Sequence, residues 1–239
     1  MKVRFRFGKM TNSILTPLQR DVLHGLFAAG LGDHGYYLTG GTALAEFYFQ
    51  HRYSEDLDLF TRKSGFDKKE LLLVKKVFDN LGLVVFREAE DSNFARYFVS
   101  REEESEKLKV EFCRDAGVRM ALPQKKNAVV IDSLEDIGVN KVCTILGRLP
   151  SESKDFCDLY FILKKTSFTL DYLLARASEK EAAFDNEEGH LLFALNLRQV
   201  DKLERMPRMI YSLTREEMAS FLVPQAETII NRLKPKGQT

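Results

Sequence analysis

Residues 37–60 read YLTGGTALAEFYFQHRYSEDLDLF, and most of what the sequence predicts depends on this stretch. It opens in an apolar, aromatic run typical of a strand, breaks at a glycine pair, and continues in a segment with the composition of a helix. It ends in the strand pattern Asp-Leu-Asp-Leu-Phe at residues 56–60. Aspartate is depleted in strands, so the pair of aspartates one residue apart needs an explanation.

Side chains on a strand alternate between two faces. Leu57 and Leu59 therefore point to the core, and Asp56 and Asp58 share the other face, about 7 Å apart at the backbone. Two carboxylates this close repel each other, and a hard divalent cation such as Mg²⁺ or Mn²⁺ removes the repulsion by binding both. The alternative, left open by these residues alone, is the solvated polar face of an edge strand.

The glycine pair lies between the first predicted strand and the following helix. Gly40, Gly41 and Thr42 thereby place bare backbone N–H groups at a helix N-terminus, which is a site for anions. The alternative is an ordinary strand-to-helix turn. A phosphate site with a carboxylate pair downstream suits a metal-bound triphosphate, in which the turn holds phosphates and the aspartates hold the metal.

A third carboxylate lies on another predicted strand, residues 107–113. Its apolar residues alternate with Lys109 and Glu111, which share the polar face. If this strand lies beside residues 56–60, Glu111 approaches the aspartate pair as a third metal ligand. An exposed glutamate on a half-buried strand is the alternative.

The remaining pattern predicts an α+β fold, with a small mixed β-sheet core and flanking helices in residues 1–132 and an all-helical domain in residues 133–239. Strand signals stop near residue 132, and helical patterns follow, so a helical domain docked against a small sheet domain is expected. The other predicted strands are 36–39, 83–88, 94–99 and 128–131; the predicted helices are 16–29, 42–50, 67–81, 133–146, 154–164, 169–184, 187–203 and 214–233.

Composition limits the classes of protein to consider. With 239 residues, 44% of them hydrophobic, the chain can bury a sizeable core. Its 36 basic and 35 acidic residues give a net charge of +1, so no whole-protein field attracts nucleic acid. Three cysteines without CxxC spacing favour reduced thiols. The sequence offers no secretory h-region and no apolar run of about 18 residues, so a cytoplasmic protein without a membrane partner is expected.

A second charged group lies in the helical half, where Lys154-Asp155-Phe156-Cys157-Asp158-Leu159 follows Lys141 and Arg148. Asp155 and Asp158 share one helix face. These residues alone favour a network of ion pairs at a domain interface. His51, next to Arg52, is expected at the surface.

Taken together, these motifs resemble a known family. Gly40 to Leu44 followed by Arg52 to Phe60 is similar to the pattern GG[TS] then R-x-S-x-D-[LI]-D of the AbiEii/AbiGii-type nucleotidyltransferases. These belong to the DNA polymerase β-like nucleotidyltransferase superfamily and include toxins of bacterial toxin–antitoxin and phage-defence systems. Lys141, Arg148 and residues 154–159 resemble the family's lysine, arginine and [KR]-D-x-x-D-L signature, so the resemblance spans about residues 36–160.

The resemblance implies a role for each matching residue. Asp56, Asp58, Lys141 and Asp158 are expected to be catalytic, with Asp56, Asp58 and Glu111 as metal ligands, although family members often carry aspartate at the position of Glu111. The expected nucleotide-binding residues are Gly40, Gly41, Thr42, Arg52, Ser54, Arg148, Lys154 and Asp155. Among them, Thr42 is expected to support the glycine turn, and Lys141 is expected to reach the triphosphate.

The implied activity is Mg²⁺-dependent transfer of an NMP from an NTP to a hydroxyl, with release of pyrophosphate. The acceptor is expected to be RNA, including a tRNA end, or a protein side chain, and a cognate antitoxin is an expected partner. Two alternatives stay open from the sequence: a non-catalytic partner-binding protein on the same fold, and a phosphotransferase.

Overall fold

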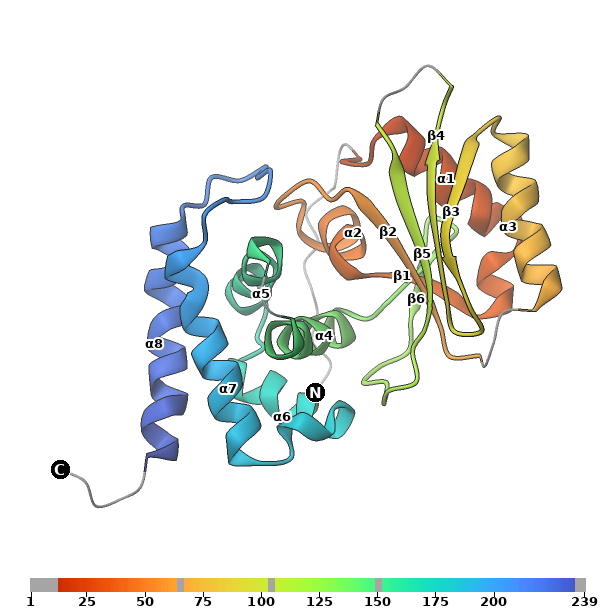
Figure 1. The fold of residues 1–239 in the computed structure, drawn as a ribbon. Coiled ribbons are helices and arrows are strands. Elements are labelled where there is room, and N and C mark those ends of the chain that lie inside the picture. The colour runs from red at the N-terminus through yellow and green to blue at the C-terminus, as the bar shows by residue number, and fades with distance from the viewer. Residues whose placement is uncertain (1–12, 64–66, 103–105, 149–151, 235–239) are drawn as a thin grey trace.

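The protein is seen in a computed structural model that describes residues 13–63, 67–102, 106–148 and 152–234 (Figure 1). The described strands form one mixed sheet in the order β3-β4-β5-β2-β1-β7-β6. Strand pairs β2–β5 and β1–β7 are parallel, and the other neighbours are antiparallel. The strands are β1 Tyr36–Thr39, β2 Asp56–Thr61, β3 Val84–Glu90, β4 Phe94–Ser100, β5 Leu108–Arg114, β6 Gln124–Lys126 and β7 Val129–Ile131.

The central strand β2 has the two faces that its sequence predicts. Leu57 and Leu59 are fully buried, whereas Asp56 and Asp58 are half-buried on the opposite face. Strand β5 lies directly beside β2, and Asp58 pairs in register with Glu111. The prediction that residues 107–113 adjoin residues 56–60 is therefore confirmed, and it brings the third carboxylate to the aspartate pair.

Helices cover both faces of the sheet (Figure 1). Helices α1 and α3 lie on one face, and α2 with the later helices lies on the other. Capping boxes begin α1 at Thr16 and α3 at Asp67, the residues where the sequence pattern predicts that these helices start. The helices are α1 Pro17–Ala28, η1 Leu31–His34, α2 Gly40–Leu44, η2 Ala45–Phe49, α3 Lys68–Asn80, α4 Leu134–Gly147, α5 Ser153–Lys165, α6 Leu170–Lys180, η3 Ala182–Phe184, α7 Glu187–Leu197, η4 Arg198–Lys202 and α8 Arg215–Leu233.

The sheet and the helical half share one hydrophobic core, which runs from Leu15 to Ile229. The chain segment before α8 also returns to the sheet half: Tyr53 N donates to Arg208 O at 2.9 Å, and Ile210 N donates to His51 O at 2.9 Å. These backbone bonds fix the segment that leads into β2. The division into two domains at residue 132 stays a prediction.

Some elements differ from the sequence pattern. The helix expected at residues 42–50 begins at Gly40 and changes at Ala45 to the wider turn of a π-helix, η2. Strand β6 was not expected, because its sequence Gln-Lys-Lys has no apolar alternation and the pairing with β7 alone defines it. Of the described helices, none is long and apolar enough to cross a membrane.

Candidate active site

A cavity of about 460 Å³ lies between the polar face of the sheet and the helices α4, α5 and α6. Its floor carries alternate residues of β2 and β5, because these residues share one face of the sheet. Its other walls are the glycine turn and the helical half. The predicted site residues that line it are Gly40, Gly41, Arg52, Ser54, Asp56, Asp58, Glu111, Lys141, Arg148, Lys154 and Asp155.

The glycine turn lies in direct contact with the residues that follow it in the motif. Gly40 has φ +68°, and a Cβ atom built on it falls 2.3 Å from Asp58 Oδ2. A Cβ atom on Gly41 falls 2.3 Å from Arg52 Nη2. Neither position has room for a side chain, and the first also needs a backbone conformation that L-residues avoid. The motif therefore requires both glycines so that the turn can lie against Asp58 and Arg52.

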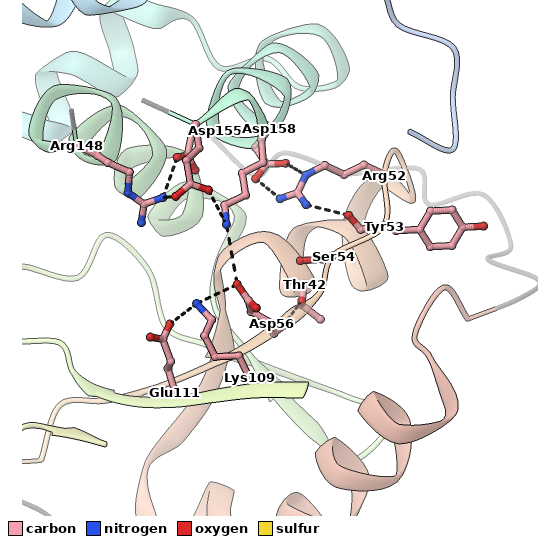
Figure 2. Close-up of polar contacts among 12 residues, drawn as sticks. Thr42, Arg52, Tyr53, Ser54, Asp56, Lys109, Glu111, Arg148, Asp155 and Asp158 are labelled. Atoms are coloured by element: carbon pink, nitrogen blue, oxygen red, sulfur yellow. Dashed lines mark hydrogen bonds and ion pairs between the residues drawn. The ribbon is translucent and has the colours of Figure 1, made fainter. Parts of the chain in front are cut away.

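A lysine bridges two of the three expected metal ligands (Figure 2). Lys109 Nζ lies 3.0 Å from Asp56 Oδ2 and 3.1 Å from Glu111 Oε2. Glu111 also accepts a hydrogen bond of 2.6 Å from Arg96 Nε. Burial opposes ionisation of Glu111, but these two cations outweigh it and hold the pKa of Glu111 below its ordinary value. Glu111 is thus adjacent to the aspartate pair and is already held by positive charge.

The surroundings of Asp58 disfavour its ionised form. Burial, together with repulsion from Glu111 and Asp56, raises the pKa of Asp58 to about 7. A cation next to Asp58 relieves this repulsion. Asp56, Asp58 and Glu111 supply the oxygen ligands that Mg²⁺ prefers, and the ammonium of Lys109 already takes a cation's place between two of them. The chemistry of the donor set therefore fits a divalent metal, although the ligand atoms of these three carboxylates do not all lie within 4.8 Å of one another in the described structure.

Another candidate ligand cluster lies apart from this cavity. Within the described ranges, the group of three potential ligand atoms that converges within 4.8 Å comprises His34, Asp67 and Glu70. Asp67 and Glu70 form the capping box of α3, and Tyr36 OH donates to Glu70 at 3.3 Å. These contacts account for the cluster as a helix start, and none of its residues lines the cavity.

Asp158 is the centre of a buried ion-pair network. Arg52 donates to both of its carboxylate oxygens, through Nε and Nη2 at 2.7 Å each. Lys141 Nζ lies 2.7 Å from Asp158 Oδ2, and His51 Nε2 lies 2.8 Å from Oδ1. Burial opposes ionisation, but Arg52 and Lys141 dominate and hold the pKa of Asp158 well below its ordinary value. The structure places Asp158 fully buried and outside the cavity lining.

The expectation that His51 is exposed is wrong. Its side chain is fully buried, packed on Phe161 with ring centroids 4.7 Å apart, and burial lowers its pKa. Its surroundings form only when α5 packs against the segment before β2, so the local sequence gave no sign of them. Arg52 is buried by the same packing.

Positively charged side chains from α4 and α5 line the cavity on the side opposite the sheet: Lys141, Arg148 at the end of α4, and Lys154. Lys141 Nζ lies 2.7 Å from Asp155 Oδ1, and Arg148 Nη1 lies 3.4 Å from Asp155 Oδ2. Lys154 Nζ lies 3.9 Å from Asp56 Oδ2. The interface network that the sequence favoured is present, and Lys141, Arg148, Lys154 and Asp155 also line the cavity.

Thr42 does not line the cavity but supports the residues that do. It is buried, and its hydroxyl donates to the backbone oxygen of Asp56. This bond ties the glycine turn to the start of β2. Two other contributors, Lys109 and Arg96, were not expected. The alternation of β5 placed Lys109 on the polar face, but the register of β4 that brings Arg96 to Glu111 is a product of the sheet.

Comparisons with known proteins identify the family of this chain. The model of the AbiEii family, described as nucleotidyl transferase AbiEii toxin of a type IV toxin–antitoxin system, matches residues 21–232. An uncharacterised protein of Aquifex aeolicus (strain VF5) is 27% identical over 173 residues, which cover 70% of this chain and 76% of that protein.

Two solved structures share the fold. One is a candidate nucleotidyltransferase from H. pylori, with a TM-score of 0.59 and 22% identity over 94% of this chain and 100% of that chain. The other is MenT4, a nucleotidyltransferase toxin from Mycobacterium tuberculosis H37Rv, with a TM-score of 0.51 and 14% identity over 90% of this chain and 84% of that chain. The family match covers nearly the whole chain, so the protein belongs to the AbiEii family of nucleotidyltransferase toxins and is an enzyme of the nucleotidyltransferase class.

Proposed function

We propose that the protein transfers an NMP from an NTP to a hydroxyl group in a metal-dependent reaction that releases pyrophosphate. The observation that carries this proposal is the contact between the glycine turn and Asp58 at the floor of one cavity. A phosphate-binding backbone and a pair of carboxylates are thereby brought within one substrate length of each other.

Asp56 and Asp58, with Glu111 beside them, are the residues that would hold Mg²⁺ or Mn²⁺. When bound, the metal neutralises charge on the phosphates and on the attacking and leaving oxygens. The pKa of Asp58, raised to about 7 by burial and by its carboxylate neighbours, supports this assignment, because a cation held between these groups would favour their ionised forms. Lys109 must then exchange its contacts with Asp56 and Glu111 for contacts with substrate.

The triphosphate is assigned to the end of the cavity where positive charge gathers. Lys109 and Lys154 lie beside Asp56 there. Lys141 and Arg148 line the same cavity from the side of α4. Gly40, Gly41 and Ser54 face this end from the other wall. In-line attack needs little covalent chemistry from the protein, so holding the phosphates and balancing their charge are the main tasks of these residues.

Asp158 and Arg52 act as positioning residues in this proposal. Asp158 is fully buried and bonded to Arg52, His51 and Lys141, so it fixes the orientation of Lys141 and of the segment before β2. Asp155 lines the cavity and accepts from Lys141, which leaves it able to orient that lysine toward the phosphates.

The acceptor is proposed to be RNA, including a tRNA end, or a protein hydroxyl, and a cognate antitoxin is proposed as partner because the family consists of toxins. A phosphotransferase is distinguished by its products, since only nucleotidyl transfer releases pyrophosphate.

The test is incubation of the protein with each α-labelled NTP, Mg²⁺ and total RNA or protein. Label transfer with pyrophosphate release is expected, and Asp58→Asn is expected to lower the rate by about 10²-fold or more. The matched control is Asp79→Asn, an exposed aspartate on α3. A protein that neither binds NTP nor transfers label, or an Asp58→Asn variant as active as the parent, would overturn the proposal.

A further inference from the structure

Lys180, the last residue of α6, has a buried ammonium group without a hydrogen-bond partner in the part of the chain that the structure describes. Its side chain is 7% exposed and lines the cavity. Among the residues that the structure describes, its nearest acidic partner is Asp115 Oδ2 at 3.7 Å, which is an ion pair too long for a hydrogen bond. An ammonium carries three donors, and leaving them unpaired in a buried place is costly. The unpaired group therefore points to a ligand.

The position of Lys180 in the cavity narrows the chemistry of that ligand. Along the cavity face of β2, Asp56 is followed by Asp58 and then Phe60, and their partners on β5 are Lys109, Glu111 and Cys113. One further step of this alternation leads to Asp115, just past the end of β5. At about 3.3 Å per residue, Asp56 and Phe60 are about 13 Å apart along the strand. The cavity thus has a cationic end at Asp56 and a second end about one nucleotide length away.

The second end suits a neutral polar ring better than a phosphate. Asp115 and Glu181 line it together with Lys180, so a phosphate placed there would meet two carboxylates. Phe60 contributes an aromatic ring to the wall of the cavity, and Cys113 and Cys143 contribute small side chains. A flat group that stacks on an aromatic face and presents an acceptor beside a donor fits all of these neighbours.

We propose that this end of the cavity is a nucleobase subsite, in which Lys180 donates to an acceptor on the base edge, Asp115 accepts from an adjacent N–H, and Phe60 offers a stacking face. Asp115 is oriented for this task, because Tyr37 OH donates to its Oδ2 at 2.9 Å. Lys180 then determines which base is accepted. This inference rests on the proposed function, since it places the base of the NTP whose phosphates lie at the Asp56 end.

Tripolyphosphate separates the two claims, because it has the phosphates of an NTP and no base. Dissociation constants are measured with Mg²⁺ for tripolyphosphate and for the four non-hydrolysable NTP analogues. In Lys180→Met, affinity for the preferred NTP is expected to fall by roughly tenfold or more, as for loss of a hydrogen bond from a charged group. Affinity for tripolyphosphate should stay within about twofold of the parent protein's, and the ranking of the four bases should flatten.

Lys154→Met is the matched control at the cationic end, where NTP and tripolyphosphate are expected to weaken in parallel. Thermal denaturation of Lys180→Met checks folding, which should be kept because methionine fills the same space without a buried charge. Equal loss of both ligands in Lys180→Met, or no change in either, would overturn the subsite. A parent protein that binds neither tripolyphosphate nor NTP would overturn the proposed function and this inference with it.

Discussion

Arg52 and Asp158 form a two-point ion pair across the interface between the sheet and α5, with both nitrogen–oxygen distances at 2.7 Å and both side chains buried. The pair joins a residue of the nucleotidyltransferase motif to a residue of the second motif, 106 positions later in the chain. It explains how two sequence signatures that lie far apart act on one site.

Breaking this pair is expected to destabilise the protein strongly. Asp158→Asn removes the charge that Arg52 and Lys141 need, and leaving buried charges without a partner costs about 3–5 kcal/mol. The free energy of unfolding, from urea titration, measures the effect. The exposed pair Lys75–Asp79 provides a control, since Asp79→Asn should change it by less than about 1 kcal/mol. Equal effects of the two substitutions would contradict a structural role for Asp158.

Substitution of Gly40 tests the contact between the glycine turn and Asp58. Gly40→Ala forces a Cβ atom into the Asp58 carboxylate, in addition to its strained φ of +68°. Gly82 has φ +62° with nothing within 4 Å of an added Cβ atom, so Gly82→Ala isolates the backbone strain. Gly82→Ala should lose about 1–2 kcal/mol of stability from strain alone, and Gly40→Ala should lose more because of the added clash.

Only Gly40→Ala should also lose NTP binding and transfer, because only there does the new atom displace a site residue. The measurement is the initial rate of label transfer, taken at a temperature where both variants are folded. A Gly40→Ala variant with the activity of Gly82→Ala would show that the turn does not have to lie against Asp58.

Lys109 is expected to compete with the metal. Its ammonium neutralises Asp56 and Glu111, so Lys109→Met should raise the affinity for Mn²⁺ by about tenfold, the equivalent of about 1.4 kcal/mol. Binding is measured by titration calorimetry without nucleotide, and Lys107→Met, an exposed lysine just before β5, is the control. Weaker Mn²⁺ binding in Lys109→Met would mean that the lysine supports the metal site instead of filling it.

The ionisation of Asp132, which lies between β7 and α4, is expected to make the free energy of unfolding depend on pH. Burial is the main cause that raises the pKa of Asp132 to about 7, although Thr39 donates a hydrogen bond to it. The folded pKa lies above the unfolded value near 3.9. The contribution of Asp132 to the free energy of unfolding is therefore fully present below pH 4. It is lost as the pH rises to about 7, by at most on the order of 4 kcal/mol.

Asp132→Asn, which stays neutral, should lack this component. The difference in unfolding free energy between the variant and the parent is measured from pH 4 to pH 8. Asp171→Asn, an exposed aspartate paired with Arg232, should keep the parent's slope. A constant difference between Asp132→Asn and the parent across this range would contradict the account.

Much of the site could be predicted because its parts are local. The alternation around Asp58 predicted the two faces of β2, and the helical pattern from residue 16 predicted α1. What the sequence could not supply depends on packing between distant segments. The burial of His51 and the contact between Arg96 and Glu111 arise from the docking of α5 and from the register of β4. Strand β6 has no apolar pattern and exists through its pairing with β7.

The central claim is that a divalent ion and an NTP bind together beside Asp56 and Asp58. Anomalous scattering from a crystal grown with Mn²⁺ and a non-hydrolysable NTP tests it most directly. The account predicts Mn²⁺ between these two carboxylates, with the phosphates against the glycine turn. Mn²⁺ found instead at His34, Asp67 and Glu70, or an NTP bound outside the cavity, would contradict it.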